Sequence, residues 1–253
     1  MSTPKKAKTQ RVLPTIDQLA ELLRIIVTIV IKSFKLLDRE SVQYWIGHEK
    51  ELAFRLKNLL HCGIETVDEK VAEWCRFYKE VFEIELDPAS VNLPAERDGF
   101  GWIVLVAKGL TRNSVFKKCY ARFGKKVWRH YDDLDKAVTV NDRESTETYT
   151  IRVRDRVEAD EEHKNKSANM VTAEGLKGMN DLERMLLELW YNWKTKDHLD
   201  KKTATICSGS RYADGDVPGS YWSGGRFSVS YVDPDDQYDH WRVREVVSLP
   251  RPS

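Results

Sequence analysis

The last fifth of the chain is crowded with residue types that proteins use to recognise ligands. From Thr203 to Ser253 there is no lysine and no asparagine, whereas tyrosine, tryptophan, serine, glycine and aspartate gather there. Large rigid aromatic side chains supply contact area at a low entropic cost, and small polar side chains supply adaptable hydrogen bonds. These residue types therefore predict a binding surface ahead of a catalytic site.

Carboxylates of the same segment could in principle hold calcium. Their spacing, Asp233, Asp235, Asp236 and Asp239, does not follow the Asp-x-Asp-x-Asp-Gly loop, and Pro234 stiffens its start. We interpret the segment as an acidic turn and expect no metal ion and no cofactor.

An enzyme remains the alternative reading of these loops. A hydrolase or transferase would use Asp214, Asp216 or His240 as acid and base. The chain has neither a recognisable nucleophile elbow nor a phosphate-binding glycine loop. We therefore expect a protein without catalytic residues.

Cysteine usage is typical of a reducing compartment. Cys62, Cys75, Cys119 and Cys207 lack pairing intervals, and His61 with Cys62 is the only close His–Cys pair, so neither disulfides nor a zinc site are predicted. No signal peptide opens the chain, which predicts a cytoplasmic protein. The apolar stretch from Leu19 to Leu37 contains four charged residues, so no membrane span is expected.

Nucleic acid is a further alternative that the charge pattern disfavours. Arg152, Arg154 and Arg156 alternate along a predicted strand and could form a basic stripe with Arg129. Acidic residues follow at once between 155 and 162, so we predict internal salt bridges instead. The net charge also changes along the chain, from +5 in residues 1–62 to −6 in residues 131–253.

Helices dominate the pattern of the first third. We expect a disordered basic tail at 1–14, then a helical module at 15–86 with helices at about 15–37, 41–60 and 67–82, and a linker at 87–97. Thr15 or Asp17 would cap the first helix. Its apolar stripe could be buried against a partner helix, which makes a homo-oligomer through these helices conceivable.

The remainder, 98–253, predicts a compact α+β unit with a mostly antiparallel sheet. Apolar runs or alternation predict strands at 102–107, 127–131, 149–154, 203–208, 226–232 and 241–248. Helices are expected at 111–123, 155–166 and 182–193, the last capped by Asn180 or Asp181. In the strand 226–232, Arg226, Ser228 and Ser230 would share a polar outer face.

This order of elements resembles the C-type lectin-like fold of the variable proteins of diversity-generating retroelements, of a type seen in small uncultured bacteria. The matching framework is Gly209-Ser210-Arg211-Tyr212, Asp214-Gly215, Val217-Pro218, Tyr221-Trp222, Val229, Pro234, Arg242, Arg244, Val246 and Val247. In that family an error-prone reverse transcriptase rewrites adenines in a segment of the gene. Lysine and asparagine codons are built mostly of adenine, so their absence agrees with the resemblance.

The resemblance implies a hypervariable segment at about 212–247 that binds a ligand, in the first instance a protein. Side chains between the framework positions, together with Tyr221, would form the binding surface. These are Gly219, Ser220, Tyr221, Ser223, Gly224, Arg226, Ser228, Ser230, Asp233, Asp235, Gln237, Tyr238 and His240.

Overall fold

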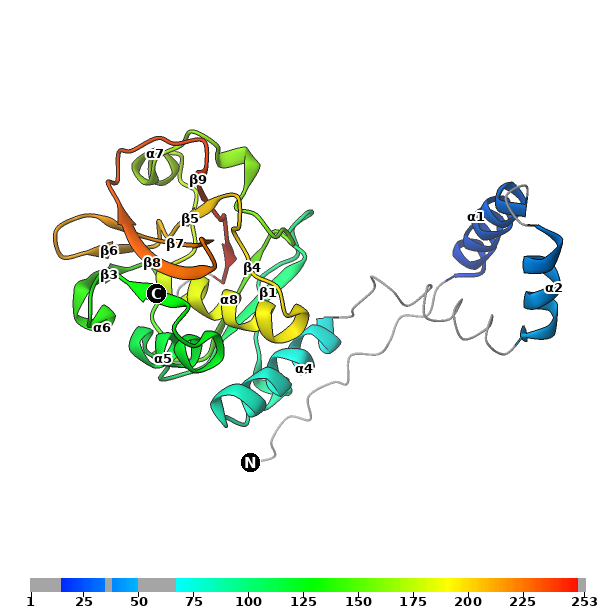
Figure 1. Cartoon of the computed structure of the whole chain (residues 1–253), viewed down its shortest axis with the longest axis horizontal. Helices are drawn as coiled ribbons and strands as arrows, with labels where there is room; N and C mark the ends of the chain where they lie inside the picture. The colour runs from blue at the N-terminus through cyan, green and yellow to red at the C-terminus, as the bar shows by residue number, and fades with distance from the viewer. Residues whose placement is uncertain (1–14, 35–37, 50–66, 250–253) are drawn as a thin grey trace, which may run out of the picture. The chain divides into compact units, whose positions relative to one another are not determined.

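The computed structural model describes residues 15–34, 38–49 and 67–249, and the chain divides into two compact units, Met1–Ile64 and Glu65–Ser253 (Figure 1). The basic tail predicted at 1–14 lies outside the described residues.

Two helices are described in the first unit, α1 (Ile16–Phe34) and α2 (Arg39–Gly47). Thr15 caps α1, because its hydroxyl accepts the Gln18 backbone N–H while the Gln18 side chain accepts that of Thr15. The part of the predicted second helix beyond residue 49 lies outside the described residues. Several large apolar side chains of α1 are exposed: Ile16, Leu22, Leu23, Ile25 and Val27.

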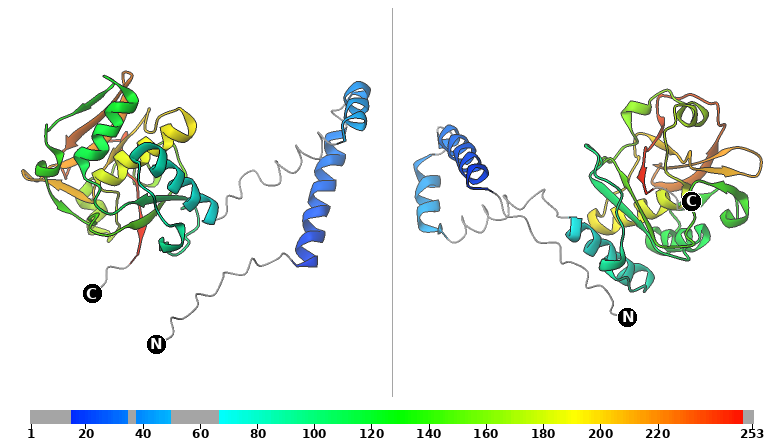
Figure 2. Two further views of the ribbon diagram at one scale, coloured as in Figure 1. Left: turned by 90° about the horizontal axis from the view of Figure 1, so that it is seen from below. Right: turned by 180° about the vertical axis from the view of Figure 1, so that it is seen from behind.

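The second unit begins with α4 (Val67–Phe77), which continues into a π-helical turn at Tyr78–Phe82. Trp74 and Tyr78 are buried in the same apolar core as the rest of this unit, and Trp74 stacks on Trp190 at 5.2 Å between ring centroids. Both views of Figure 2 show α4 beside the helix that carries Trp190. The division of the chain therefore falls at Ile64/Glu65, not at the linker expected at 87–97, because the third helix packs on the second unit.

The second unit has α+β structure with mostly antiparallel strands, which confirms the predicted fold class. After a short 3₁₀ turn at Pro88–Ser90 its elements are β1 (Trp102–Val106), α5 (Arg112–Phe123), β2 (Val127–Arg129), α6 (Leu134–Ala137), β3 (Val138–Asn141), β4 (Tyr149–Val153), a 3₁₀ turn at Glu161–His163, α7 (Ala168–Ala173), α8 (Asp181–Thr195), β5 (Ala204–Ile206), β6 (Ser210–Tyr212), β7 (Val217–Ser223), β8 (Arg226–Val232), β9 (Trp241–Val243) and β10 (Val247–Ser248).

Three sheets organise these strands. One has the order β1-β4-β10, the largest has the order β2-β8-β7-β5-β9, and β3 pairs with β6. In the largest sheet the two outer pairings, β2 with β8 and β5 with β9, are parallel, and the inner ones are antiparallel. The five-stranded sheet therefore ends in a short parallel strand at each edge.

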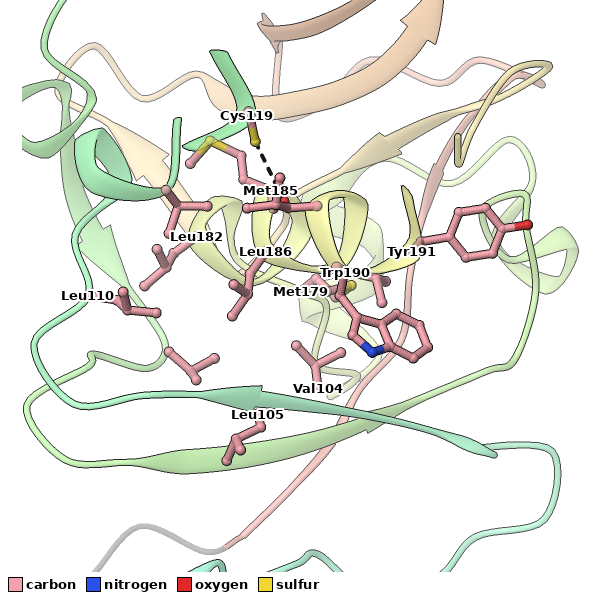
Figure 3. Packing of buried hydrophobic residues seen from close by; sticks show 14 of the residues in the cluster. Val104, Leu105, Leu110, Cys119, Met179, Leu182, Met185, Leu186, Trp190 and Tyr191 are labelled. Atoms are coloured by element: carbon pink, nitrogen blue, oxygen red, sulfur yellow. Dashed lines mark hydrogen bonds between the residues drawn. The ribbon is translucent and has the colours of Figure 1, made fainter. Parts of the chain in front are cut away.

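The helix α8 forms the centre of the core. Asn180 and Glu183 cap it reciprocally through backbone and side chain, and all its residues from Asp181 to Asn192 are buried. Figure 3 shows Leu186 and Trp190 pointing from α8 toward Val104 of β1, while Met185 faces Cys119 of α5. The predicted helix at 182–193 and its Asn180 cap are thus confirmed.

Two local predictions were wrong, and the elements β3, β6, β7, α6 and α7 were not predicted. Residues 155–166 form turns with one short 3₁₀ segment instead of a helix, because Asp160 turns inward to accept the Glu245 backbone N–H and to pair with Arg154. The expected strand at 241–248 is split into β9 and β10, because buried Arg244 leaves the ladder. The strand β7 was missed, since its Pro-Gly sequence is typical of a turn.

None of the described helices is both long enough and apolar enough to cross a membrane.

Candidate ligand-binding face

One row of side chains crosses the five-stranded sheet on a single face. Trp128 of β2 is in register with Ser228 of β8, Ser228 with Tyr221 of β7, and Ala204 of β5 with Trp241 of β9. Directly paired residues point to the same side of a sheet, and the β5–β7 register places Ala204 beside Tyr221. With neighbouring strands about 4.8 Å apart, the row spans roughly 19 Å. We call it the aromatic row.

Each ring of the aromatic row packs against a neighbouring residue. Tyr221 and Trp241 meet edge to face with centroids 5.6 Å apart. A Cβ atom on Gly219 would lie 2.0 Å from the nearest Trp241 ring atom, so the indole rests on bare backbone at this position. Trp128 is 37% exposed and carries the Arg226 guanidinium 5.6 Å above its ring. The row is therefore shaped by close packing and still open to solvent.

The far part of the same face is closed by α7. Ile206, Val217, Val232 and Val243 form a small apolar cluster with Ala168 and Val171 of that helix. The loop after β8 is tied to the same segment, because the Pro234 carbonyl accepts the Asn169 backbone N–H and the Tyr238 carbonyl accepts that of Asn165. A fixed loop thus borders the open part of the face.

A hollow of about 290 Å³ lies at the β9 end of the row. It is lined by Lys201, Lys202, Thr203, Ala204, Tyr221, Trp222, Ser223, His240 and Trp241. Aromatic walls with hydroxyl and amine groups can accept a side chain of a partner and hydrogen-bond its polar atoms.

The opposite face of the sheet is held by buried charges. Asp200 accepts hydrogen bonds from Arg184 at 2.8 Å and Arg244 at 2.6 Å, and Arg184 also pairs with Glu188 at 3.0 Å. Thr205 of β5 donates to Asp200 at 2.5 Å. Burial alone would raise the pKa of Asp200, but Arg244 and Arg184 hold it below its usual value. The carboxylate therefore stays ionised and ties α8 to the back of the sheet.

Most of the predicted site residues lie on the surface. Ser223, Gly224, Arg226, Asp233, Asp235, Gln237, Tyr238 and His240 are exposed, and Tyr221 and Ser230 are half buried. Tyr221 belongs to the aromatic row, and Ser223, Gly224 and Arg226 lie at the β7–β8 hairpin beside it. The residues from Asp233 onward lie in the bordering loop.

Three predicted contact residues are buried and present no surface. Ser220 is fully buried on the back face beside Thr205, Ser228 is 1% exposed between the strands of Trp128 and Tyr221, and Gly219 lies beneath Trp241. The sequence could not reveal this, because alternation assigns faces but says nothing about what covers them.

Two residues of the row, Trp128 and Trp241, were missing from the predicted set. Trp128 lies in a strand that was predicted, but its parallel pairing with β8, about a hundred residues later, leaves no local signal. Trp241 begins a predicted strand next to His240, so the aromatic type at that position was the available clue.

The enzyme alternative needs His240 beside Asp214 or Asp216, and Asp214 and Asp216 lie together while His240 lies elsewhere. Asp214 and His240 line separate hollows, and Asp214 accepts the Tyr131 hydroxyl at 2.7 Å, which lowers the pKa of Asp214. Burial and the neighbouring carboxylates raise the pKa of Asp216. In the described parts of the chain, no three His, Cys, Asp or Glu side chains are grouped so that they could hold a metal ion.

The arginine stripe is satisfied internally, as the sequence indicated. Arg154 pairs with Asp160 and Glu245, and Arg156 pairs with Glu162. Arg152 is buried and donates to the Pro94 carbonyl.

The described cysteines are free thiols. Cys119 and Cys207 are buried, and burial raises the pKa of each, whereas Cys75 is half buried. Cys62 lies outside the described residues. Buried thiols with a raised pKa are poor nucleophiles, so these two cysteines act as core side chains.

No family model, curated protein or solved structure matches this chain.

Proposed function

We propose that the second unit is a non-catalytic module that binds a protein on the aromatic row, as a diversified variable protein on a C-type lectin-like scaffold. The observation that carries the proposal is the row itself: three large aromatic side chains share one open sheet face whose reverse side is fixed by the core and by buried charges. Rigid aromatic anchors on a rigid support are what protein recognition surfaces use.

The arrangement of strands and helices also supports the scaffold. The strand β10, near the end of the unit, lies in the same sheet as β1, near its start. The helices α5 and α8 pack against each other in the apolar core. The exposed predicted residues cluster on a hairpin and one bordering loop, where substitution would leave the core intact.

Binding can be tested with peptides selected from a displayed random library on the immobilised full chain. We expect selected peptides to lose binding to the double variant Trp128→Ala and Tyr221→Ala, and to keep it with Tyr120→Ala, whose ring is exposed on α5. If no peptide is enriched, or if the double variant binds equally well at an unchanged melting temperature, the proposal is wrong.

Diversification has a separate test in the DNA around the gene. We expect a near-copy of the stretch encoding residues 215–247, with mismatches at adenines, beside a reverse transcriptase gene. If neither is found, the proposal that the segment is diversified by a retroelement is wrong. The proposal of a binding face would then depend on the peptide experiment alone.

A further inference from the structure

A group of carboxylates gathers in the turn between β6 and β7 and in the loop after β8. We call this group the acidic rim; it comprises Asp214, Asp216, Asp233, Asp235 and Asp236. Within the described parts of the chain, none of these five is within ion-pair distance of a lysine, arginine or histidine. Their recorded side-chain partners are neutral, namely the Tyr131 and Tyr238 hydroxyls, the Asn169 amide and backbone N–H groups.

This contrasts with acidic residues elsewhere in the unit. Glu162 pairs with Arg156, Asp160 with Arg154, and Glu174 with Lys166. The difference follows from the sequence, because no lysine occurs after Lys202 and, of the arginines described beyond that point, only Arg226 is exposed. Burial and then Asp214, Asp233 and Asp236 raise the pKa of Asp216 against the opposing effect of His130, which agrees with a net negative field.

The acidic rim adjoins the aromatic row through exposed rings. The His130 ring lies 6.1 Å from Trp128 and 4.5 Å from Tyr231, and Tyr231 is 47% exposed just before Asp233. Tyr131, next to His130, donates its hydroxyl to Asp214. Tyr231 lies on the side of β8 that carries Phe227 and Val229, so these rings connect the aromatic row to the carboxylates around the β2–β8 edge of the sheet.

We infer that the segment of the partner protein that docks on the aromatic row is basic where it continues around the β2–β8 edge, with lysine or arginine side chains over Tyr231 and beside the acidic rim. The inference rests on the proposed function and adds the chemistry of the partner. A cation over an aromatic ring and beside carboxylates gains from both, and charge complementarity selects partners and speeds association.

The cations Arg226, Lys201 and Lys202 lie away from the acidic rim. Arg226 lies over Trp128 from the hairpin side, Lys201 pairs with Asp197, and Lys202 lies in the hollow at the β9 end. The charge therefore changes across the face, from cations at the hairpin and the β9 end to carboxylates at the acidic rim. A basic segment is expected to approach from the side of the acidic rim.

The selected peptides provide the test. We expect them to be enriched in lysine and arginine over the unselected library, and to bind more weakly as salt is raised. For the tightest peptide, the triple variant Asp233→Asn, Asp235→Asn and Asp236→Asn should bind about ten-fold more weakly in fluorescence anisotropy, since three exposed charge pairs together contribute about that factor.

The matched control replaces carboxylates away from the face, Glu85→Gln with Glu147→Gln, and should leave the affinity unchanged. Both sets keep the side-chain shape, and their melting temperatures check folding. Peptides without a basic bias, or a triple variant with unaltered affinity for peptides that still need Tyr221, would overturn the inference and leave the proposed function standing. Peptides that bind regardless of the aromatic row would overturn both.

Discussion

At the scale of single residues, Gly219 sets the shape of the aromatic row. Its backbone φ is not in the left-handed region, so the requirement for glycine comes from the ring above it and not from the conformation. An added methyl group would occupy the space of the Trp241 indole, which also packs against Tyr221.

We therefore predict that Gly219→Ala lowers the free energy of unfolding by about 1–3 kcal/mol, because the Trp241 ring must leave its position. Urea unfolding at neutral pH measures the loss. Ser223→Ala, at the exposed end of the same strand, serves as the control and should have little effect. Equal stability of the two variants would show that the indole does not rest on Gly219.

The buried charges behind the sheet make a second prediction at this scale. Asp200→Asn should lower the free energy of unfolding by about 3–5 kcal/mol, because Arg184 and Arg244 would remain buried without their counter-charge. Asp197→Asn, an exposed carboxylate three residues earlier, is the matched control in the same urea titration. A similar small loss in both would mean that the network is open to water.

The network also fixes the sign of the pH dependence. The pKa values of Asp200 and Glu245 are lowered in the folded chain, against the effect of burial, by their arginine partners, and that of Glu162 falls from 4.5 to about 2. A lowered folded pKa contributes stability above the unfolded pKa, which is lost as the pH falls through the folded pKa. We expect stability to fall below about pH 4, less steeply in Asp200→Asn; buried Asp181, whose pKa is raised, acts in the opposite direction.

At the scale of elements, side chains of α4 and of the turn that follows it form hydrogen bonds to the edge strand β1, where another strand could otherwise pair. Lys70, Trp74 and Tyr78, one helical turn apart, donate to the carbonyls of Gly101, Ile103 and Leu105, which alternate along the free edge of β1. Donors four residues apart on a helix are separated by about 6 Å along its axis, and carbonyls two residues apart on a strand by about 6.6 Å. The spacing of the donors therefore nearly matches that of the carbonyls. An edge that would otherwise pair with another chain is covered.

Tyr78→Phe is predicted to lower the free energy of unfolding by about 1–3 kcal/mol, since the buried Leu105 carbonyl and Ala107 N–H would both lose their partner. The measurement is urea unfolding, with Tyr120→Phe on exposed α5 as the control. If Tyr78→Phe unfolds like the wild type, α4 covers the edge by packing alone.

Sequence patterns located the elements better than their partners. The apolar stripe and Asn180 cap identified α8, a continuous apolar run identified β1, and an alternating run identified β4. The strand β7 was hidden by Pro218 and Gly219, which are typical of a turn; here Gly219 leaves room for the Trp241 indole. Of the site, the hairpin and loop residues were predictable from composition, but the row was not, because it needs the pairing of β2 with β8.

At the scale of the whole molecule, the described helix α1 of the first unit differs from the helices of the second unit in how much apolar surface it buries. Large apolar side chains of α1 are exposed, whereas those of α8 are not. We expect the full chain to self-associate through α1 and a fragment of residues 65–253 to be a monomer with an unchanged melting midpoint. Light scattering with size exclusion gives both masses, against 29.4 kDa for one full chain.

The variant Leu23→Asp should return the full chain to one subunit, because its exposed side chain would bring a charge into the contact. A full chain that is monomeric without this substitution contradicts self-association, and a fragment that fails to fold contradicts the division at Ile64/Glu65.

The most direct measurement follows the indole N–H signals of the full chain by NMR while a selected peptide is added, with Trp→Phe variants for assignment. We predict that the signals of Trp128 and Trp241 move with saturation, while those of Trp74, which donates to the Ile103 carbonyl, and buried Trp190 stay in place. Shifts confined to Trp74, Trp102 and Trp190 would place the ligand on the α4 side of the unit and contradict the binding face described above.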